Sequence, residues 1–109
     1  MIVTIFRSRL RPGIDEDYGL VAARMDALAT SMPGYVSHKG FVAEDGERVT
    51  IVEFESDDAL RTWRLHPEHR EAQQAGRDRF YAEYSLTTAQ VLRRSEFKVS
   101  DRDKTASNC

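Results

Sequence analysis

Residues that build disulfides, zinc sites and fibrous chains are scarce in this sequence. The 109 residues include one cysteine, Cys109, together with three prolines and six glycines. A single cysteine excludes an intrachain disulfide and a cysteine-type metal site, and such low cysteine use is typical of a reducing compartment. So little proline and glycine also excludes a collagen-like or low-complexity chain. The composition therefore predicts an ordinary globular protein of one domain.

Strong net charge and long apolar segments are absent as well. Sixteen basic and eighteen acidic side chains leave a formal charge of -2. The arginines are scattered among the acids, which argues against nucleic acid as a partner. No apolar run approaches the ~20 residues of a membrane span. Residues 2–6 follow Met1 without the basic start and cleavage site of a signal peptide, so we expect a cytoplasmic protein with no membrane partner.

The spacing of apolar residues predicts four strands and two helical regions. The expected strands are residues 2–10, 35–43, 48–55 and 84–94. An Asp-Gly pair between the second and third strands favours a tight hairpin. A long amphipathic helix is expected over residues 14–32, because three acidic residues favour its first turn. Ser56 is a good N-cap for a short helix, and Pro67 suits the first turn of another that continues to about Tyr84.

This order, β-α-β-β-α-β, predicts an α+β fold of the ferredoxin-like split βαβ type, a four-stranded antiparallel sheet with its helices on one face. Residues 1–97 form this domain, and residues 98–109 are expected to be a flexible tail without aromatic side chains. In the first strand Val3 and Ile5 point to one face and Phe6 to the other. Because both faces are apolar at their centres, we expect a second copy to cover the free face and form a homodimer.

Trp63, His66 and His69 are the candidate catalytic residues. An indole can stack on an aromatic substrate and donate its N–H to a ring oxygen, and an imidazole can accept a proton near neutral pH. The two histidines are three residues apart across a helix start and Pro67 fixes their relation, so both can face one cavity. The group can therefore bind and deprotonate a flat, acidic ring.

Each of these residues also has a structural interpretation. Trp63 can be a core anchor, His66 can end the helix that carries the tryptophan, and His69 can be solvated. Two histidines can also share a metal ion. Glu68 and Glu71 do not complete a known ligand spacing, however, so no metal is expected.

A second group of residues is expected to bind the substrate: Phe6, Ser8, Gln73, Gly76, Phe80 and Tyr81. Three of them continue from His69 along one stripe of the predicted helix. Gly76, inside that helix, favours the close approach of a ligand or of a packed neighbour. Tyr81 can donate a hydrogen bond to a substrate or pack against other side chains. His38, in the second strand, is expected to reach the dimer interface.

The chain resembles a known family in three segments: Phe54 to Trp63 (FESDDALRTW), His66 to His69 (HPEH) and Gly76 to Tyr81 (GRDRFY). With the predicted order of elements, these resemble the antibiotic biosynthesis monooxygenase superfamily of dimeric α+β barrels, over residues 1–97. Some members oxidise phenolic polyketide rings to quinones with molecular oxygen and without metal, haem or flavin; others degrade haem. The resemblance implies a homodimeric, cofactor-independent monooxygenase that acts on a small aromatic, phenolic or quinol-type molecule with O2 as co-substrate.

At three positions this chain differs from characterised members of the family, and these differences bear on which of the family's reactions is expected. Haem-degrading relatives have an Asn near the end of the first strand and a His ligand ten residues after the Trp, where this chain has Ser8 and Gln73. Quinone-forming members have an Asn one helical turn before the Trp, where this chain has Ala59. Haem degradation is therefore disfavoured. A non-catalytic ligand-binding or stress-associated barrel and a non-oxidative cyclase stay open. So does a loosely bound flavin, although the sequence has no glycine-rich phosphate loop.

Overall fold

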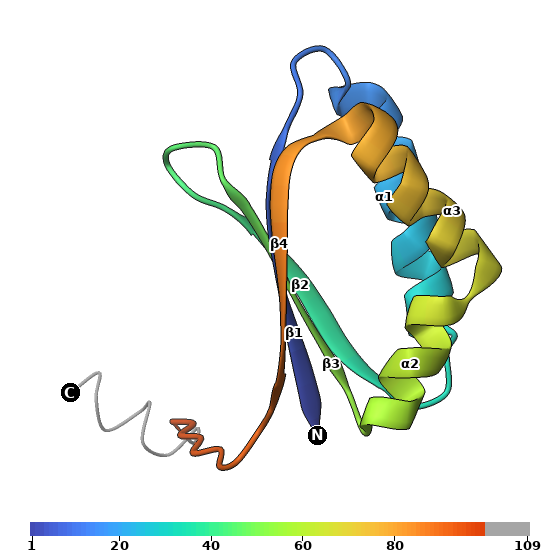
Figure 1. Cartoon of the computed structure of the whole chain (residues 1–109). Helices are drawn as coiled ribbons and strands as arrows, with labels where there is room; N and C mark the ends of the chain where they lie inside the picture. The colour runs from blue at the N-terminus through green and yellow to red at the C-terminus, as the bar shows by residue number, and fades with distance from the viewer. Residues whose placement is uncertain (100–109) are drawn as a thin grey trace.

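The structure, a computed structural model, describes residues 1–99. Its elements are β1 (Ile2–Leu10), α1 (Asp15–Thr30), β2 (Tyr35–Val42), β3 (Arg48–Phe54), α2 (Asp57–Leu65), α3 (Pro67–Ala75), the π-helical turn η1 (Gly76–Phe80) and β4 (Tyr81–Gln90). The strands form one antiparallel sheet in the order β2-β3-β1-β4. All the helices lie on one face of this sheet (Figure 1). The predicted split βαβ architecture is confirmed.

Local interactions explain where the helices begin. Three acidic side chains in the first turn of α1 complement the positive end of the helix dipole. The Ser56 hydroxyl accepts a hydrogen bond from the Ala59 amide at 3.1 Å and caps α2. His66 caps α3, because its Nδ1 accepts from the Glu68 amide at 3.2 Å, and Pro67 occupies the first turn. Two separate caps therefore divide this part of the chain into two short helices.

The last helical region ends at a turn that the sequence pattern does not reveal. β4 begins at Tyr81, so the expected helix to about Tyr84 and the expected strand start there are wrong. The Arg11 guanidinium donates to the carbonyl oxygens of Arg77 and Asp78, both at 2.7 Å, and of Tyr81 at 3.0 Å. The last carbonyls of a helix need such partners, because the helix itself supplies none. Arg11 thus closes the helix at η1, from a position far away in the sequence.

The hydrophobic core lies between the sheet and the helices. Phe54 of β3 is fully buried and packs with Ala29, Leu60 and Trp63 from the helices. Phe80 is buried as well, at the end of η1. Burying a large apolar side chain contributes roughly 1.5–3 kcal/mol. These contacts hold α1 and α2 at a fixed distance above the sheet, and the candidate site lies in the same layer.

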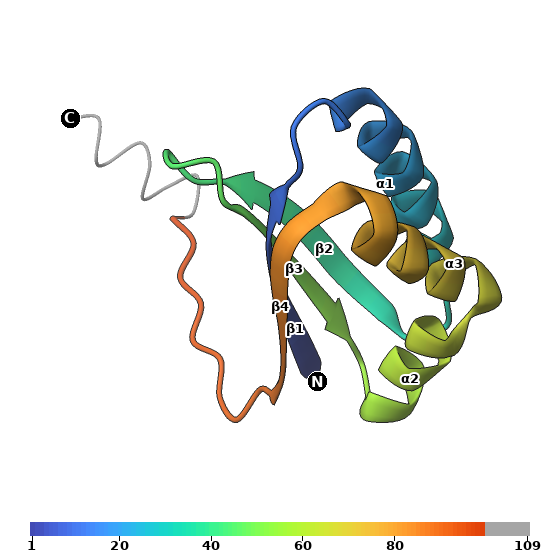
Figure 2. The same ribbon diagram turned by 45° about the horizontal axis from the view of Figure 1, so that its top comes forward.

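Among the described residues, no helix covers the opposite face of the sheet (Figure 2). The strand register pairs Ile5 with Ile51, and alternation along the strands places both on this free face with Val3 and Val49. All four side chains are partly buried by their neighbours on the sheet. The free face therefore has an apolar centre.

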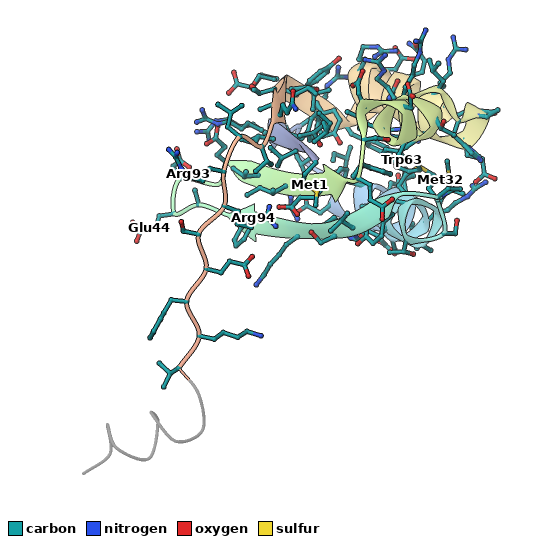
Figure 3. The ribbon with its side chains drawn as sticks, turned by 90° about the horizontal axis from the view of Figure 1, so that it is seen from below. Met1, Met32, Glu44, Trp63, Arg93 and Arg94 are labelled. Atoms are coloured by element: carbon teal, nitrogen blue, oxygen red, sulfur yellow. The ribbon has the colours of Figure 1, made fainter. Side chains whose placement is uncertain are left out.

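The segment that follows β4 runs on the side of the sheet away from the helices, where Figure 3 labels Arg94. Its guanidinium donates to the Glu53 carboxylate at 2.6 Å. Of the predicted tail, residues 100–109 lie outside the described residues. Within residues 1–99, no helix combines the length and the apolarity that crossing a membrane requires.

Candidate active site

A cavity of about 380 Å³ lies between the helices and the sheet. All four strands contribute to its floor, and α1, α2 and α3 contribute to its walls. Its volume falls in the range of small-molecule sites, about 300–1,000 Å³. Figure 3 shows Trp63 on the side of the sheet that faces the helices. A flat aromatic molecule therefore has room between the two layers.

Trp63 and His69 form one wall of the cavity. Their rings are stacked, with centroids 3.9 Å apart and an interplanar angle of 14°. Within residues 1–99 the indole N–H has no hydrogen-bond acceptor, yet every side-chain nitrogen or oxygen that is fully sealed from solvent has a partner. The N–H therefore touches open space, and Trp63, which is only 8% exposed, lines the cavity. Trp63 is thus a core anchor and a cavity wall at once.

The hydrogen bonding of His69 decides which of its nitrogens can accept a proton. Its Nδ1 lies 3.1 Å from the backbone carbonyl oxygen of Trp63. A carbonyl only accepts, so Nδ1 carries the hydrogen and Nε2 of the neutral ring has the lone pair. Burial lowers the pKa of His69 below its usual 6.5; the bond to the Trp63 carbonyl opposes this shift, and nearby His66 adds to it. The ring is therefore neutral at pH 7.

His66 does not line the cavity. Its backbone is extended between α2 and α3, with φ of -59° and ψ of 132°, and its ring caps α3. The structure therefore brings one of the two histidines to the cavity and leaves the other at a helix start. Within residues 1–99, no group of three or more His, Cys, Asp or Glu side chains gathers where it can hold a metal ion.

The expected substrate-binding residues divide into two sets. Phe6, Gln73 and Tyr81 line the cavity, whereas Ser8, Gly76 and Phe80 do not. Those three residues are buried in the surrounding packing. Gly76 lies against the ring of Tyr81, so closely that a Cβ at this position would be 2.5 Å from the Tyr81 Cε2 atom. Of the two explanations for this glycine, close packing is the one the geometry supports.

Tyr81 lines the cavity and is held by aromatic neighbours. Its ring packs edge-on against Phe6 with centroids 5.3 Å apart, and against Tyr18 at 5.9 Å. Burial, with the nearby Tyr18 as the next cause, raises the pKa of the Tyr81 phenol above its usual 10. The phenol therefore keeps its proton at neutral pH.

Ala59, which replaces the Asn of the quinone-forming members, does not line the cavity. It packs against Gly34 in the turn before β2, where a Cβ on the glycine would be 2.5 Å from the Ala59 Cβ. Gly34 also has a φ of 81°, which only glycine adopts readily. The Ala59 methyl group therefore lies in close contact with this turn.

His38 is a cavity residue that the sequence analysis misses. Its Nδ1 lies 2.6 Å from the Tyr35 hydroxyl and its Nε2 lies 3.3 Å from Asp26 Oδ1 on α1. The carboxylate only accepts, so Nε2 carries a hydrogen, whereas the hydroxyl can donate or accept. The expectation of a dimer contact is wrong, because a register shift between Tyr35 and Ser37 breaks the alternation from which it follows.

Three threonines on the cavity floor are also missed: Thr4, Thr50 and Thr88. Thr4 is two residues before Phe6 and shares its face of β1, so the period of the strand contains the signal. A threonine in a strand is ordinary, however, and only the cavity above it gives the position interest.

Comparisons with known proteins agree with this fold. The antibiotic biosynthesis monooxygenase family matches residues 1–75. The chain is 35% identical over 89 residues to the uncharacterized protein YqjZ of Bacillus subtilis (strain 168), covering 82% of this chain and 78% of that protein. SnoaB, a cofactor-independent oxygenase from Streptomyces nogalater, superimposes with a TM-score of 0.66 and 26% identity, covering 85% of this chain and 97% of SnoaB. Rv0793 from Mycobacterium tuberculosis superimposes with a TM-score of 0.77 and 19% identity, covering 87% and 98%. The chain therefore belongs to the antibiotic biosynthesis monooxygenase family.

Proposed function

We propose that this protein is a cofactor-independent monooxygenase that oxidises a phenolic or quinol-type aromatic molecule with O2. The observation that carries the proposal is the Trp63–His69 wall, where an indole N–H without a partner and a neutral imidazole border the cavity. Membership of the family and the likeness to SnoaB support the oxygenase class.

The substrate ring lies in the cavity beside this wall, and the indole N–H of Trp63 donates to one of its oxygens. His69 Nε2 accepts the proton of a phenol or of an activated ring C–H. The resulting anion is electron-rich and gives its electrons to O2. When a ring CH2 becomes C=O, one oxygen atom stays in the product and the other leaves as water with both hydrogens. The substrate itself thus supplies all four electrons that reduce O2, two for the oxygen atom kept in the product and two for the one that leaves as water.

The functional unit is a homodimer joined through the free face of the sheet. The apolar centre of that face consists of Val3, Ile5, Val49 and Ile51. The ion pairs of Arg7 with Glu47 at 2.9 Å and of Arg94 with Glu53 at 2.6 Å also involve this face. An apolar centre with a polar rim is the usual anatomy of a protein interface, and two packed sheets are a common architecture.

Oxygen uptake tests the reaction class. The protein is incubated with a panel of quinols and anthrones in metal-free buffer, in air and under nitrogen. The proposal requires oxygen consumption and a ring carbonyl labelled from 18O2. Product under nitrogen would instead identify a cyclase, and saturable binding without turnover would identify a binding protein.

Single variants test the two residues of the wall. His69→Gln keeps a polar side chain but removes the base, and we expect kcat to fall by about 100-fold or more, the usual contribution of a general base. Trp63→Phe keeps an aromatic ring and removes the N–H donor. His66→Asn keeps a good N-cap for α3. If His66→Asn loses as much activity as His69→Gln, the assignment of the base to His69 alone is wrong.

A further inference from the structure

The floor of the cavity holds a hydroxyl group that faces the cavity and has no hydrogen-bond partner within residues 1–99. Thr4 of β1 is 7% exposed, and with Ser8 it is one of two buried polar residues within residues 1–99. No side chain or backbone group in this part of the chain forms a hydrogen bond with the Thr4 hydroxyl. Because no fully sealed polar atom there lacks a partner, this hydroxyl touches open space. Thr4 lines the cavity, so that space is the cavity.

A second hydroxyl lies beside it. Thr88 of β4 is directly opposite Thr4 in the antiparallel register, and it lines the same cavity. Side chains of directly opposed residues on one face have Cβ atoms about 4.5–5.5 Å apart. The two hydroxyls do not hydrogen-bond with each other, so both remain available to a ligand. Together they form a pair of hydroxyls on the cavity floor, on the layer opposite the Trp63–His69 wall.

A hydroxyl that faces the cavity can bond to water there, and a ligand that displaces this water without replacing the bond leaves the hydroxyl unpaired, which is unfavourable. Valine has nearly the same shape and a higher preference for strands, so packing alone gives no reason for threonine here. A ligand oxygen that completes the hydrogen bond does give one.

We propose that Thr4, assisted by Thr88, is a binding subsite for an oxygen substituent on the sheet-facing edge of an aromatic ring. The substrate class is then a planar ring with oxygens on two separate edges, one directed to the Trp63–His69 wall and one to the sheet. This inference rests on the proposed function for the identity of the reaction, but the subsite is a binding property and is testable without turnover.

Binding is measured under nitrogen by equilibrium dialysis with naphthalene-1,5-diol, whose hydroxyls lie on opposite edges, and with naphthalene, which has none. We expect Thr4→Val to weaken diol binding about 3- to 10-fold, the effect of one hydrogen bond, and to change naphthalene binding less than about twofold. Thr4→Ser retains the hydroxyl and keeps diol affinity within about twofold. Thr62→Val, on the exposed side of α2, is the matched control and leaves both affinities unchanged.

The Tm of the ligand-free Thr4→Val variant is a second readout, because losing a hydroxyl that serves the fold would lower it. Because the Thr4 hydroxyl has no partner within residues 1–99, Thr4→Val removes no intramolecular hydrogen bond, and we expect the Tm of the ligand-free protein not to fall. A lower Tm together with unchanged diol affinity would mean that the hydroxyl serves the fold, and would overturn the proposal.

Two further outcomes separate this inference from the proposed function. If Thr4→Val leaves diol affinity unchanged, or if neither ring binds saturably, the subsite is overturned whatever oxygen uptake is measured. If Thr4→Val weakens diol binding and leaves naphthalene binding nearly unchanged, while no quinol or anthrone gives oxygen uptake, the subsite is supported and the oxygenase is contradicted.

Discussion

The polar groups on the two faces of the sheet differ in whether they have hydrogen-bond or ion-pair partners. On the helix-facing side, the Thr4 hydroxyl and the Trp63 N–H border a cavity and have no partner within residues 1–99. On the free side, the charged groups are paired, as the 2.6 Å contact between Arg94 and Glu53 shows. One sheet thus carries unsatisfied hydrogen-bonding capacity on one face and satisfied charges around an apolar centre on the other.

This difference indicates what each face is suited to contact. A small polar ligand can complete single donors and acceptors inside a cavity, so groups kept free there contribute to specificity. A protein surface of fixed shape is matched best by an apolar centre whose surrounding charges are already paired, because unpaired charges are costly to desolvate. The contrast supports the proposed ligand binding on the helix side and the proposed self-association on the free side.

The most severe test of this contrast places a charge at the centre of the free face. In Ile5→Glu, a carboxylate replaces an apolar side chain that is paired across the sheet with Ile51 and Thr87. An unpaired charge buried at an interface costs about 3–5 kcal/mol, so we expect the dimer dissociation constant to rise by at least ~100-fold. Sedimentation velocity over a concentration series measures this.

Leu20→Glu is the matched control, since Leu20 lies on α1 and is 70% exposed. This variant should stay dimeric. A wild-type protein that is monomeric at high concentration, or an Ile5→Glu variant that associates as well as the wild type, would contradict the role of the free face.

The next test acts on the cavity side through Gly76. In Gly76→Ala, the new methyl group meets the rigid ring of Tyr81, since a Cβ there lies 2.5 Å from Cε2. The overpacking costs typically 1–3 kcal/mol, and the better helix propensity of alanine offsets up to ~1 kcal/mol. We expect a net loss of about 1–2 kcal/mol in urea denaturation, together with weaker ring binding because Tyr81 shifts.

Gly19→Ala is a sensitive control for this result. Gly19 lies in α1, and a Cβ there meets nothing within 4 Å. Alanine should therefore stabilise the protein by about 0.5–1 kcal/mol. If both variants are stabilised equally, the contact between Gly76 and Tyr81 does not constrain the cavity.

The sequence predicts the fold well because the signals for it are local. The apolar period of α1, the Ser56 cap and the Asp-Gly turn each depend on neighbouring residues, and each element is observed. The start of β4 is mispredicted for a non-local reason. Arg11 closes the preceding turn from about seventy positions earlier in the chain, and no pattern around Tyr81 contains that information.

The site is predictable to a similar extent. Trp63 and His69 are close in sequence and lie on adjacent short helices, so their convergence follows from spacing. His38 reaches the cavity only because a register shift turns the strand, and Thr4 matters only because nothing bonds to it. A strand irregularity and a missing partner are properties of the assembled structure, which explains why residue patterns do not identify these two.

A smaller effect is expected from unpairing a charge on the free face. Glu53 has a side chain only 17% exposed and accepts from Arg94, so Glu53→Gln should lower the unfolding free energy by up to about 1 kcal/mol. Glu96→Gln is the control, because Glu96 is 76% exposed and 3.9 Å from the same arginine, and it should change little. Equal effects of the two variants in urea denaturation would show that the pair at position 53 has no special role.

The most subtle test concerns the charge of His69, the titratable ring in the Trp63 wall. Burial lowers its folded pKa below the unfolded value of 6.5, so the unfolded chain binds the proton more readily. The neutral ring therefore contributes full stability above pH 6.5, and this contribution is lost as the pH falls through the folded pKa. Urea denaturation of the wild type at pH 7.5 and 5.5 should show this loss, and His69→Gln should show less of it.

Because Trp63 is the chain's single tryptophan, its emission reports the same event, with a midpoint below 6.5 in the wild type that disappears in His69→Gln. A midpoint above 6.5 would mean that the ring is exposed or paired with an acid, and would remove the neutral base from the cavity wall.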